Sequence, residues 1–148
     1  MMNCRPTGVQ VPLELRLVVP EENATPIQAS LAYKPNDPYA VHITFHSDAP
    51  GATDVSWSFS RELLTEGLYR QTGMGDVKVW PWAGRSQQAL GMALSSPDGY
   101  ALFEITRSAV ELFLSRSYAL VPAGAEADFF DMEIELGILW SKPDADAR

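Results

Sequence analysis

Residues 37–82, DPYAVHITFHSDAPGATDVSWSFSRELLTEGLYRQTGMGDVKVWPW, decide the fold that this chain is expected to adopt. Between residues 39 and 46, apolar and polar side chains alternate, with Val41, Ile43 and Phe45 on one face. Such alternation is typical of a strand with one buried and one wet face. The stretch therefore begins with a half-buried strand.

A second alternation, over residues 55–59, leads directly into a helix. The Ser60 hydroxyl can accept a hydrogen bond from one of the first free amide groups of a helix over residues 61–66. Gly67 then closes this helix, because glycine is the usual residue after a helix C-terminus. The pattern predicts a strand, a cap and one short internal helix.

The rest of the chain supplies five more strands and two more helices. By the same alternation, strands are expected at residues 9–19, 27–34, 76–82, 87–95 and 100–105. Ser108 and Glu111 match a capping box at the start of a helix over residues 108–118. Residues 126–140 fit a helix and a strand; helix is favoured, since this length is long for a strand and acidic residues favour a helix N-terminus.

These elements predict an α+β fold with about seven mostly antiparallel strands, one short internal helix and two C-terminal helices. The length of 148 residues fits one domain over 1–148, with loose ends expected at 1–8 and 142–148. The single cysteine, Cys4, cannot pair within the chain and suits a reducing cytoplasm. No apolar run approaches the roughly 20 residues of a membrane span, so no membrane insertion is expected.

The net charge of −8 is unevenly distributed along the chain. It is −3 over residues 1–54, zero over 55–120 and −5 over 121–148. Nucleic-acid binding draws its affinity largely from basic side chains, so this distribution favours a protein partner over a phosphate backbone.

Catalytic and metal-binding motifs are not recognised in the sequence. His42 and His46, four residues apart on a strand, would be separated by about 13 Å and could not share one zinc ion. Gly73-Met74-Gly75 lacks the third glycine of a dinucleotide loop and precedes a strand. The sequence therefore predicts no catalytic residues, no metal and no cofactor.

Trp80 and Trp82 share one face of an expected strand with Lys78. Aromatic and basic side chains together can form a platform for single-stranded nucleic acid, on which bases stack. The alternative is that the tryptophans pack against a helix or a neighbouring subunit. Packing is favoured, because the acidic chain would repel phosphates.

Three segments in order, DPYAV, WSFSRELLTEGLYRQTGMGDVKVWP and ALSSPDGYAL, resemble the SsgA-like proteins of sporulating actinobacteria. The resemblance runs from about Leu13 to Trp140. It implies a fold similar to the Whirly single-stranded nucleic-acid-binding proteins, assembled as a homotrimer. It also implies a non-catalytic cytoplasmic protein of sporulation-specific division, acting at the septum. Its partners would be SsgA-type division proteins and the tubulin-like ring protein FtsZ, which it would help to recruit.

The interface with such a partner is predicted around the short helix and the loop that follows it. Arg61, Glu66 and Arg70, together with Trp82, are the candidate contact residues, because exposed charged and aromatic side chains near loops commonly carry recognition. The alternative function is a single-stranded nucleic-acid-binding protein of Whirly-like fold. An enzyme acting on cell-wall precursors is suggested only by the setting of division and by no residue.

Overall fold

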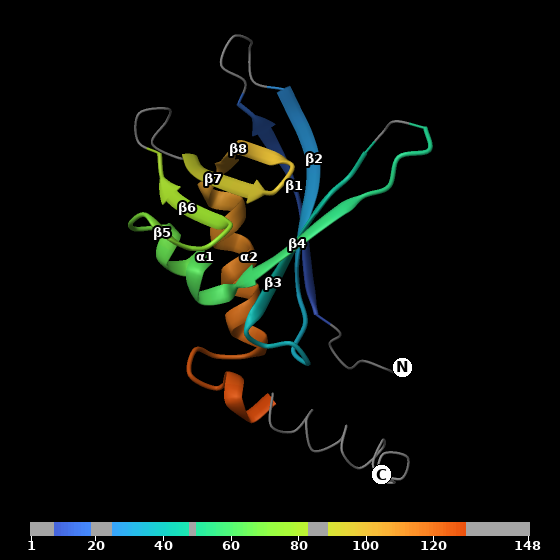
Figure 1. The fold of residues 1–148 in the computed structure, drawn as a ribbon. Helices are drawn as coiled ribbons and strands as arrows, with labels where there is room; N and C mark the ends of the chain where they lie inside the picture. The colour runs from blue at the N-terminus through green and yellow to red at the C-terminus, as the bar shows by residue number, and fades with distance from the viewer. Residues whose placement is uncertain (1–7, 19–24, 48–49, 83–88, 130–148) are drawn as a thin grey trace, which may run out of the picture.

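The structure, a computed structural model, describes residues 8–18, 25–47, 50–82 and 89–129. Within these ranges the chain forms one antiparallel sheet of eight strands, two helices and a further helical turn at residues 126–129 (Figure 1). The strands are β1 (Val9–Leu17), β2 (Thr25–Tyr33), β3 (Ala40–Phe45), β4 (Val55–Ser60), β5 (Thr72–Met74), β6 (Val77–Pro81), β7 (Ala89–Ser96) and β8 (Gly99–Thr106). The helices are α1 (Arg61–Gly67) and α2 (Arg107–Leu120).

The α+β class and the antiparallel strands are confirmed, but the sheet has one strand more than the seven expected. The additional strand is β5, in the glycine-rich segment that was expected to be a loop. It pairs with β6 through a turn in which Gly75 has a φ of 69°, a conformation that glycine adopts readily.

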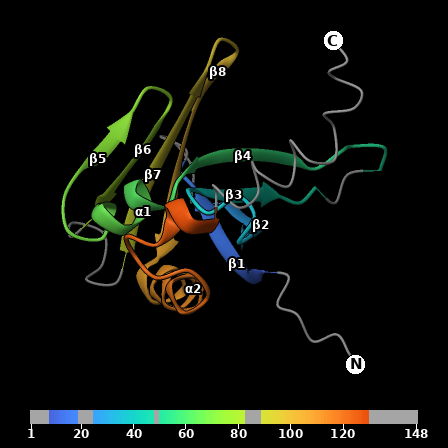
Figure 2. The same cartoon turned by 90° about the horizontal axis from the view of Figure 1, so that it is seen from below.

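The strand order β4-β3-β2-β1-β8-β7-β6-β5 makes β4 and β5 the two outer strands of the described sheet. Figure 1 shows two arms, β1–β4 and β5–β8, which meet where β1 pairs with β8. Seen from below in Figure 2, the arms enclose an angle, and α1 lies between the ends of β4 and β5. The curl of the sheet thus brings its two outer strands to the same side of the molecule.

The core fills the inner side of this curled sheet. β1 contributes Leu13 and Leu15, β2 contributes Leu31, and Phe113 of α2 is fully buried in the same cluster. The buried residues of α2 recur at the three- and four-residue spacing of one helical face, and this face packs on β1 and β8. Further buried apolar side chains include Val11, Val41, Ile43, Leu64, Val79, Leu90, Met92, Ile105, Val110 and Leu114.

Helix α1 begins as predicted but ends for a different reason. The Ser60 Oγ accepts a hydrogen bond from the Leu63 amide at 2.9 Å. Gly67 is the last helical residue, and its φ is not in the left-handed region. A Cβ at this position would lie 2.4 Å from Val79 Cγ1. Gly67 therefore allows α1 to approach β6 closely and does not act as a left-handed cap.

The predicted capping box at the start of α2 is wrong. The N-cap is Thr106, which makes no side-chain capping hydrogen bond. Glu111 instead accepts a hydrogen bond from Arg107 Nε at 2.9 Å, one turn earlier on the exposed face. Arg107 Nη1 also donates to the Leu68 carbonyl after α1, so this arginine and the buried face hold α2 in place.

Residues 126–129 are helical, which confirms the helix interpretation of the last segment as far as residue 129. The remainder of that segment, up to residue 140, lies outside the described residues, as do the expected loose ends at 1–8 and 142–148 apart from residue 8. The likeness to the Whirly fold stays a prediction. In the described ranges, neither helix is long and apolar enough to pass through a bilayer.

Candidate functional site

A groove of about 700 Å³ lies between β4, α1 and the β5–β6 hairpin. Its lining residues come from β4, from α1, from β5 and from the turn and first residue of β6: Trp57, Ser58, Phe59, Ser60, Glu62, Leu63, Glu66, Thr72, Gly73, Asp76 and Val77. The groove exists because the sheet curls and leaves the space between β4 and β5 open.

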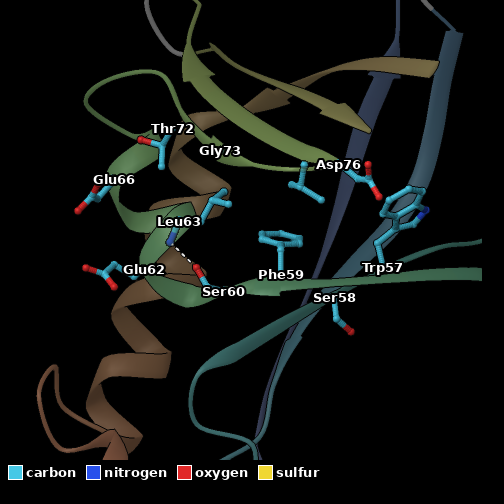
Figure 3. Close-up of a pocket in the computed structure, with 11 residues that line it drawn as sticks. Trp57, Ser58, Phe59, Ser60, Glu62, Leu63, Glu66, Thr72, Gly73 and Asp76 are labelled. Atoms are coloured by element: carbon cyan, nitrogen blue, oxygen red, sulfur yellow. Dashed lines mark hydrogen bonds between the residues drawn. The ribbon is translucent and has the colours of Figure 1, made fainter. Parts of the chain in front are cut away.

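The centre of the groove is apolar. The Phe59 ring points from β4 toward the β5–β6 hairpin, and Leu63 extends from α1 toward the same space (Figure 3). Trp57, two residues before Phe59 on the same face of β4, lies at the far end opposite Asp76. Phe59 is only 8% exposed, whereas Trp57 and Leu63 are half-buried, so the hydrophobic floor of the groove is accessible mainly at these two residues.

The rim of the groove is acidic. Among the described residues that line it, Glu62, Glu66 and Asp76 are acidic and none is basic. Figure 3 shows Glu62 and Glu66 on the outer face of α1 and Asp76 on the hairpin across the groove. Such an arrangement attracts cationic ligands and repels phosphates.

Glu66, near the end of α1, forms an ion pair with Arg70, three residues after the helix. Arg70 Nη2 donates to Glu66 Oε1 at 3.1 Å, and the Arg70 side chain is 71% exposed. An exposed pair of this kind stabilises the protein by only about 0.3–0.5 kcal/mol. Both residues are therefore available to a partner, and their role as contact residues stays a prediction.

Arg61 is not on the surface, so the prediction that it is an exposed contact residue is wrong. Its side chain is 1% exposed. The guanidinium carbon lies 4.6 Å from the ring centroid of Tyr33 and 3.9 Å from that of Tyr118. Arg61 Nη1 donates to the Ser117 carbonyl oxygen at 3.1 Å, and Nη2 donates to Glu126 Oε2 at 2.7 Å. Arg61 joins four segments of the fold.

The ion pair with Arg61 changes the acidity of Glu126. Burial alone would raise the pKa of the Glu126 carboxyl, but hydrogen bonds from Arg61 and from the Gly124 amide outweigh burial and lower its pKa. Burial also raises the pKa of Tyr33 to about 12, although the neighbouring Arg61 opposes this shift. The Tyr33 hydroxyl donates to the Pro38 carbonyl at 2.8 Å. This cluster is a structural centre of the fold, outside the groove.

Trp82 lies away from the groove, beside Trp80. The two ring centroids are 5.7 Å apart, with the planes tilted by 52°. Trp80 covers Gly91 of β7, because a Cβ there would lie 2.3 Å from Trp80 Cε2. Trp80 also borders a smaller hollow of about 290 Å³ with Lys78 and Tyr100. Trp82 is therefore not among the residues that line the groove.

The two histidines have separate partners. His42 contacts Asp37 at 3.2 Å and Ser58 Oγ at 2.8 Å. His46 contacts Asp54 at 3.0 Å and Ser30 Oγ at 3.2 Å. The described part of the chain contains no group of three His, Cys, Asp or Glu residues placed to hold a metal ion. The histidines connect neighbouring strands through hydrogen bonds.

The sequence interpretation missed the groove itself. The sequence pattern assigns residues 55–59 only to a strand and residue 76 only to the start of another strand. Their meeting depends on the curl of the sheet, for which local alternation carries no signal. Burial of Arg61 had a weak signal, because Arg61, Leu64 and Leu68 share the spacing of one helical face.

The protein is a small α+β protein with a curled antiparallel sheet. Its short helix α1 lies between the two outer strands of the sheet and borders the groove. The family described as the Streptomyces sporulation and cell division protein SsgA matches residues 27–126. A relative from Salinispora tropica, the sporulation-specific cell division protein SsgB, is 53% identical over 87% of this chain and 90% of its own length. SsgB of Streptomyces coelicolor is 50% identical over 88% of this chain and 93% of its own.

Two solved structures that resemble this fold also come from SsgB and SsgA-like proteins. A crystal structure of an SsgA-like sporulation-specific cell division protein from Thermobifida fusca has a TM-score of 0.81 and 40% identity, and covers 92% of this chain and 98% of its own. A second structure comes from work on SsgB mutations that correlate with longitudinal cell division during sporulation of Streptomyces coelicolor. It has a TM-score of 0.76 and 48% identity, and the match covers 85% of this chain and 99% of that chain. The chain belongs to the SsgA-like family of sporulation and cell division proteins.

Proposed function

We propose that this protein is a non-catalytic factor of sporulation-specific cell division that helps to position or recruit the FtsZ ring at septation sites through protein contacts. It would act in the cytoplasm at the septum, with SsgA-type division proteins as further partners and as a homotrimer. The relatives named sporulation-specific cell division proteins support the general role.

The observation that carries the contact mechanism is the surface around α1. It combines an open groove, a hydrophobic floor and exposed charged residues at Glu66 and Arg70. Interface centres commonly combine apolar anchors with a polar rim. No side-chain arrangement among the described residues of this surface suggests a reaction.

Binding to purified FtsZ tests the proposal directly. Arg70→Glu should weaken co-sedimentation with FtsZ polymers, by about tenfold in affinity if Arg70 faces the partner. Arg116→Glu on α2 is a matched control, because it makes the same charge change at an exposed position on another element. The double variant Glu66→Arg with Arg70→Glu restores a charge pair; if it restores binding, the loss reflects helix stability and Arg70 makes no contact.

The mass of the assembly can be measured in the same samples. Light scattering of the protein alone should give three times the chain mass, and the FtsZ mixture should add a heavier species. No FtsZ binding by the unmodified protein would contradict the proposed recruitment. A monomer mass would contradict the proposed trimer.

A second candidate function, binding of single-stranded nucleic acid, is favoured by the side-by-side Trp80 and Trp82 with Lys78 nearby. Titration of a fluorescent oligonucleotide at low salt tests it. Genuine binding should weaken steeply as salt rises and should depend on Trp80. The absence of binding at micromolar protein would rule out this candidate.

A further inference from the structure

Alternate residues of β4 direct their backbone amide and carbonyl groups away from β3, toward the groove. The Arg61 amide donates to the Tyr39 carbonyl at 2.8 Å, which makes these two opposed residues a hydrogen-bonded pair in the register of β3 and β4. Hydrogen-bonded pairs alternate in an antiparallel ladder, so the amides of Trp57 and Phe59 also point toward β3. The amides and carbonyls of Ser56 and Ser58 therefore point to the other side, where β4 is the outer strand of the described sheet.

This outward side of β4 borders the groove. Ser58 lines the groove, yet its side chain points away and its Oγ lies 2.8 Å from His42 Nδ1 (Figure 3). The part of Ser58 that faces the groove is consequently its backbone. An outer strand with exposed amides and carbonyls is a template for one more strand.

We propose that the groove binds an extended, basic segment of a protein partner as an added strand on β4, paired with Ser56 and Ser58. The proposal rests on the proposed function, in that the protein acts through contacts with other proteins, and it specifies the kind of segment bound. In strand addition, backbone hydrogen bonds give affinity and alternate side chains give specificity.

The apolar residues of β4 and α1 explain how alternate side chains would be recognised. Val55 is 53% exposed and shares its face of β4 with Trp57 and Phe59. Leu63 and Val77 line the facing side of the groove. Every second side chain of an added strand would point to this floor, and the others would point to the rim.

Charge decides which segment fits. The rim carries Glu62, Glu66 and Asp76, of which, within the described part of the chain, only Glu66 forms an ion pair, with Arg70. A segment with lysine or arginine at alternate positions would neutralise the rim. The chain's own C-terminal part, with a net charge of −5 over residues 121–148, would be repelled, and a second copy of this chain carries −8. A basic segment of another protein is therefore the occupant.

A peptide of alternating lysine and valine is the probe, and its glutamate–valine analogue is the control. With isotopically labelled protein, the lysine peptide should shift the amide resonances of Ser56 and Ser58 and slow their hydrogen exchange at least about tenfold. The glutamate peptide should have no effect. Shifts confined to other surfaces, or none at millimolar peptide, would overturn the proposal.

Two further comparisons separate strand addition from simple charge attraction. A lysine–valine peptide methylated on alternate backbone nitrogens cannot form the ladder, and its affinity should fall at least about tenfold. Equal binding of the methylated peptide would overturn strand addition. Asp76→Lys should weaken the lysine peptide about tenfold, whereas Asp98→Lys, the same charge change in the exposed turn between β7 and β8, should not.

The occupant and the proposed function can be tested separately. Amide shifts of Ser56 and Ser58 that depend on protein concentration without peptide would identify a second copy as the occupant and overturn the proposal. If the lysine peptide binds as described but FtsZ does not bind the unmodified protein, the groove proposal stands and FtsZ recruitment fails. The reverse outcome is also possible: the lysine peptide does not bind, whereas FtsZ binds the unmodified protein and Asp76→Lys equally well. In that case FtsZ recruitment stands and the groove proposal fails.

Discussion

Arg61 and Glu126, 65 residues apart in the chain, form an ion pair with an Nη2–Oε2 distance of 2.7 Å in which the arginine side chain is only 1% exposed. The guanidinium also lies against the rings of Tyr33 and Tyr118. Such stacking suits the planar, weakly hydrated guanidinium better than an ammonium group. The contact connects β2, α1, α2 and the segment after α2.

Replacing Arg61 is expected to destabilise the fold strongly. Arg61→Ala leaves the Glu126 carboxylate largely buried without its partner, which costs about 3–5 kcal/mol in free energy of unfolding. Arg61→Lys should recover only part of this loss, because lysine keeps the charge but not the planar stacking. Urea denaturation followed by circular dichroism measures both variants.

The matched control for Arg61 is Arg70→Ala, which removes an exposed ion pair. It should change the free energy of unfolding by less than about 1 kcal/mol. Equal losses for Arg61→Ala and Arg70→Ala would contradict the structural role assigned to Arg61.

The Glu126 carboxylate should make stability depend on pH in the acid range. Its pKa in the folded protein lies below the ordinary value of 4.5, so its contribution is fully present above pH 4.5. The contribution is lost as the pH falls through the lowered pKa, because protonation removes the charge paired with Arg61. Melting temperatures measured from neutral pH downward should fall more steeply for the unmodified protein than for Glu126→Gln. Parallel curves would contradict this assignment.

Local patterns in the sequence predicted most of the strands correctly. Alternation located β3 and β4 closely, because both have one buried and one wet face. It missed β5, whose three residues Thr72–Met74 are too short to show alternation and include a glycine. β5 pairs with β6 because the chain reverses at Gly75, which places Thr72–Met74 beside Val77–Val79.

The candidate site was predictable only in part. Of the candidate contact residues, Arg70 is exposed, as expected, and pairs with Glu66 near the end of α1. The burial of Arg61 depends on partners in distant segments, Tyr33, Ser117 and Glu126, which a local pattern cannot bring together. The groove likewise depends on long-range pairing of β1 with β8, which sets the curl of the sheet.

The contact of Gly67 with Val79 should make Gly67→Ala destabilising although alanine favours helices. Alanine would gain about 1 kcal/mol in helix propensity. Its Cβ would lie 2.4 Å from Val79 Cγ1, and overpacking of this kind typically costs about 1–3 kcal/mol and can exceed that range. A net loss is expected in chemical denaturation. Gly99→Ala, at a position with open space around the added Cβ, is the control and should stay within about 0.5 kcal/mol.

A double-mutant cycle shows whether the two residues are coupled. Val79→Ala removes the methyl groups in the way, so Gly67→Ala should cost less in that background than in the unmodified protein. Additive losses would mean that Gly67→Ala acts elsewhere.

The last prediction concerns the Trp80 indole, which covers Gly91 across the β6–β7 pair. A Cβ at residue 91 would lie 2.3 Å from Trp80 Cε2, so Gly91→Ala must displace the indole from its place beside Trp82. The near-ultraviolet circular dichroism of the tryptophan pair should decrease, and Trp80 fluorescence should shift toward that of an exposed indole. Unfolding should be easier by about 1–3 kcal/mol, and Trp80→Ala should remove most of this penalty. An unchanged tryptophan spectrum in Gly91→Ala would contradict the packing of Trp80 on β7.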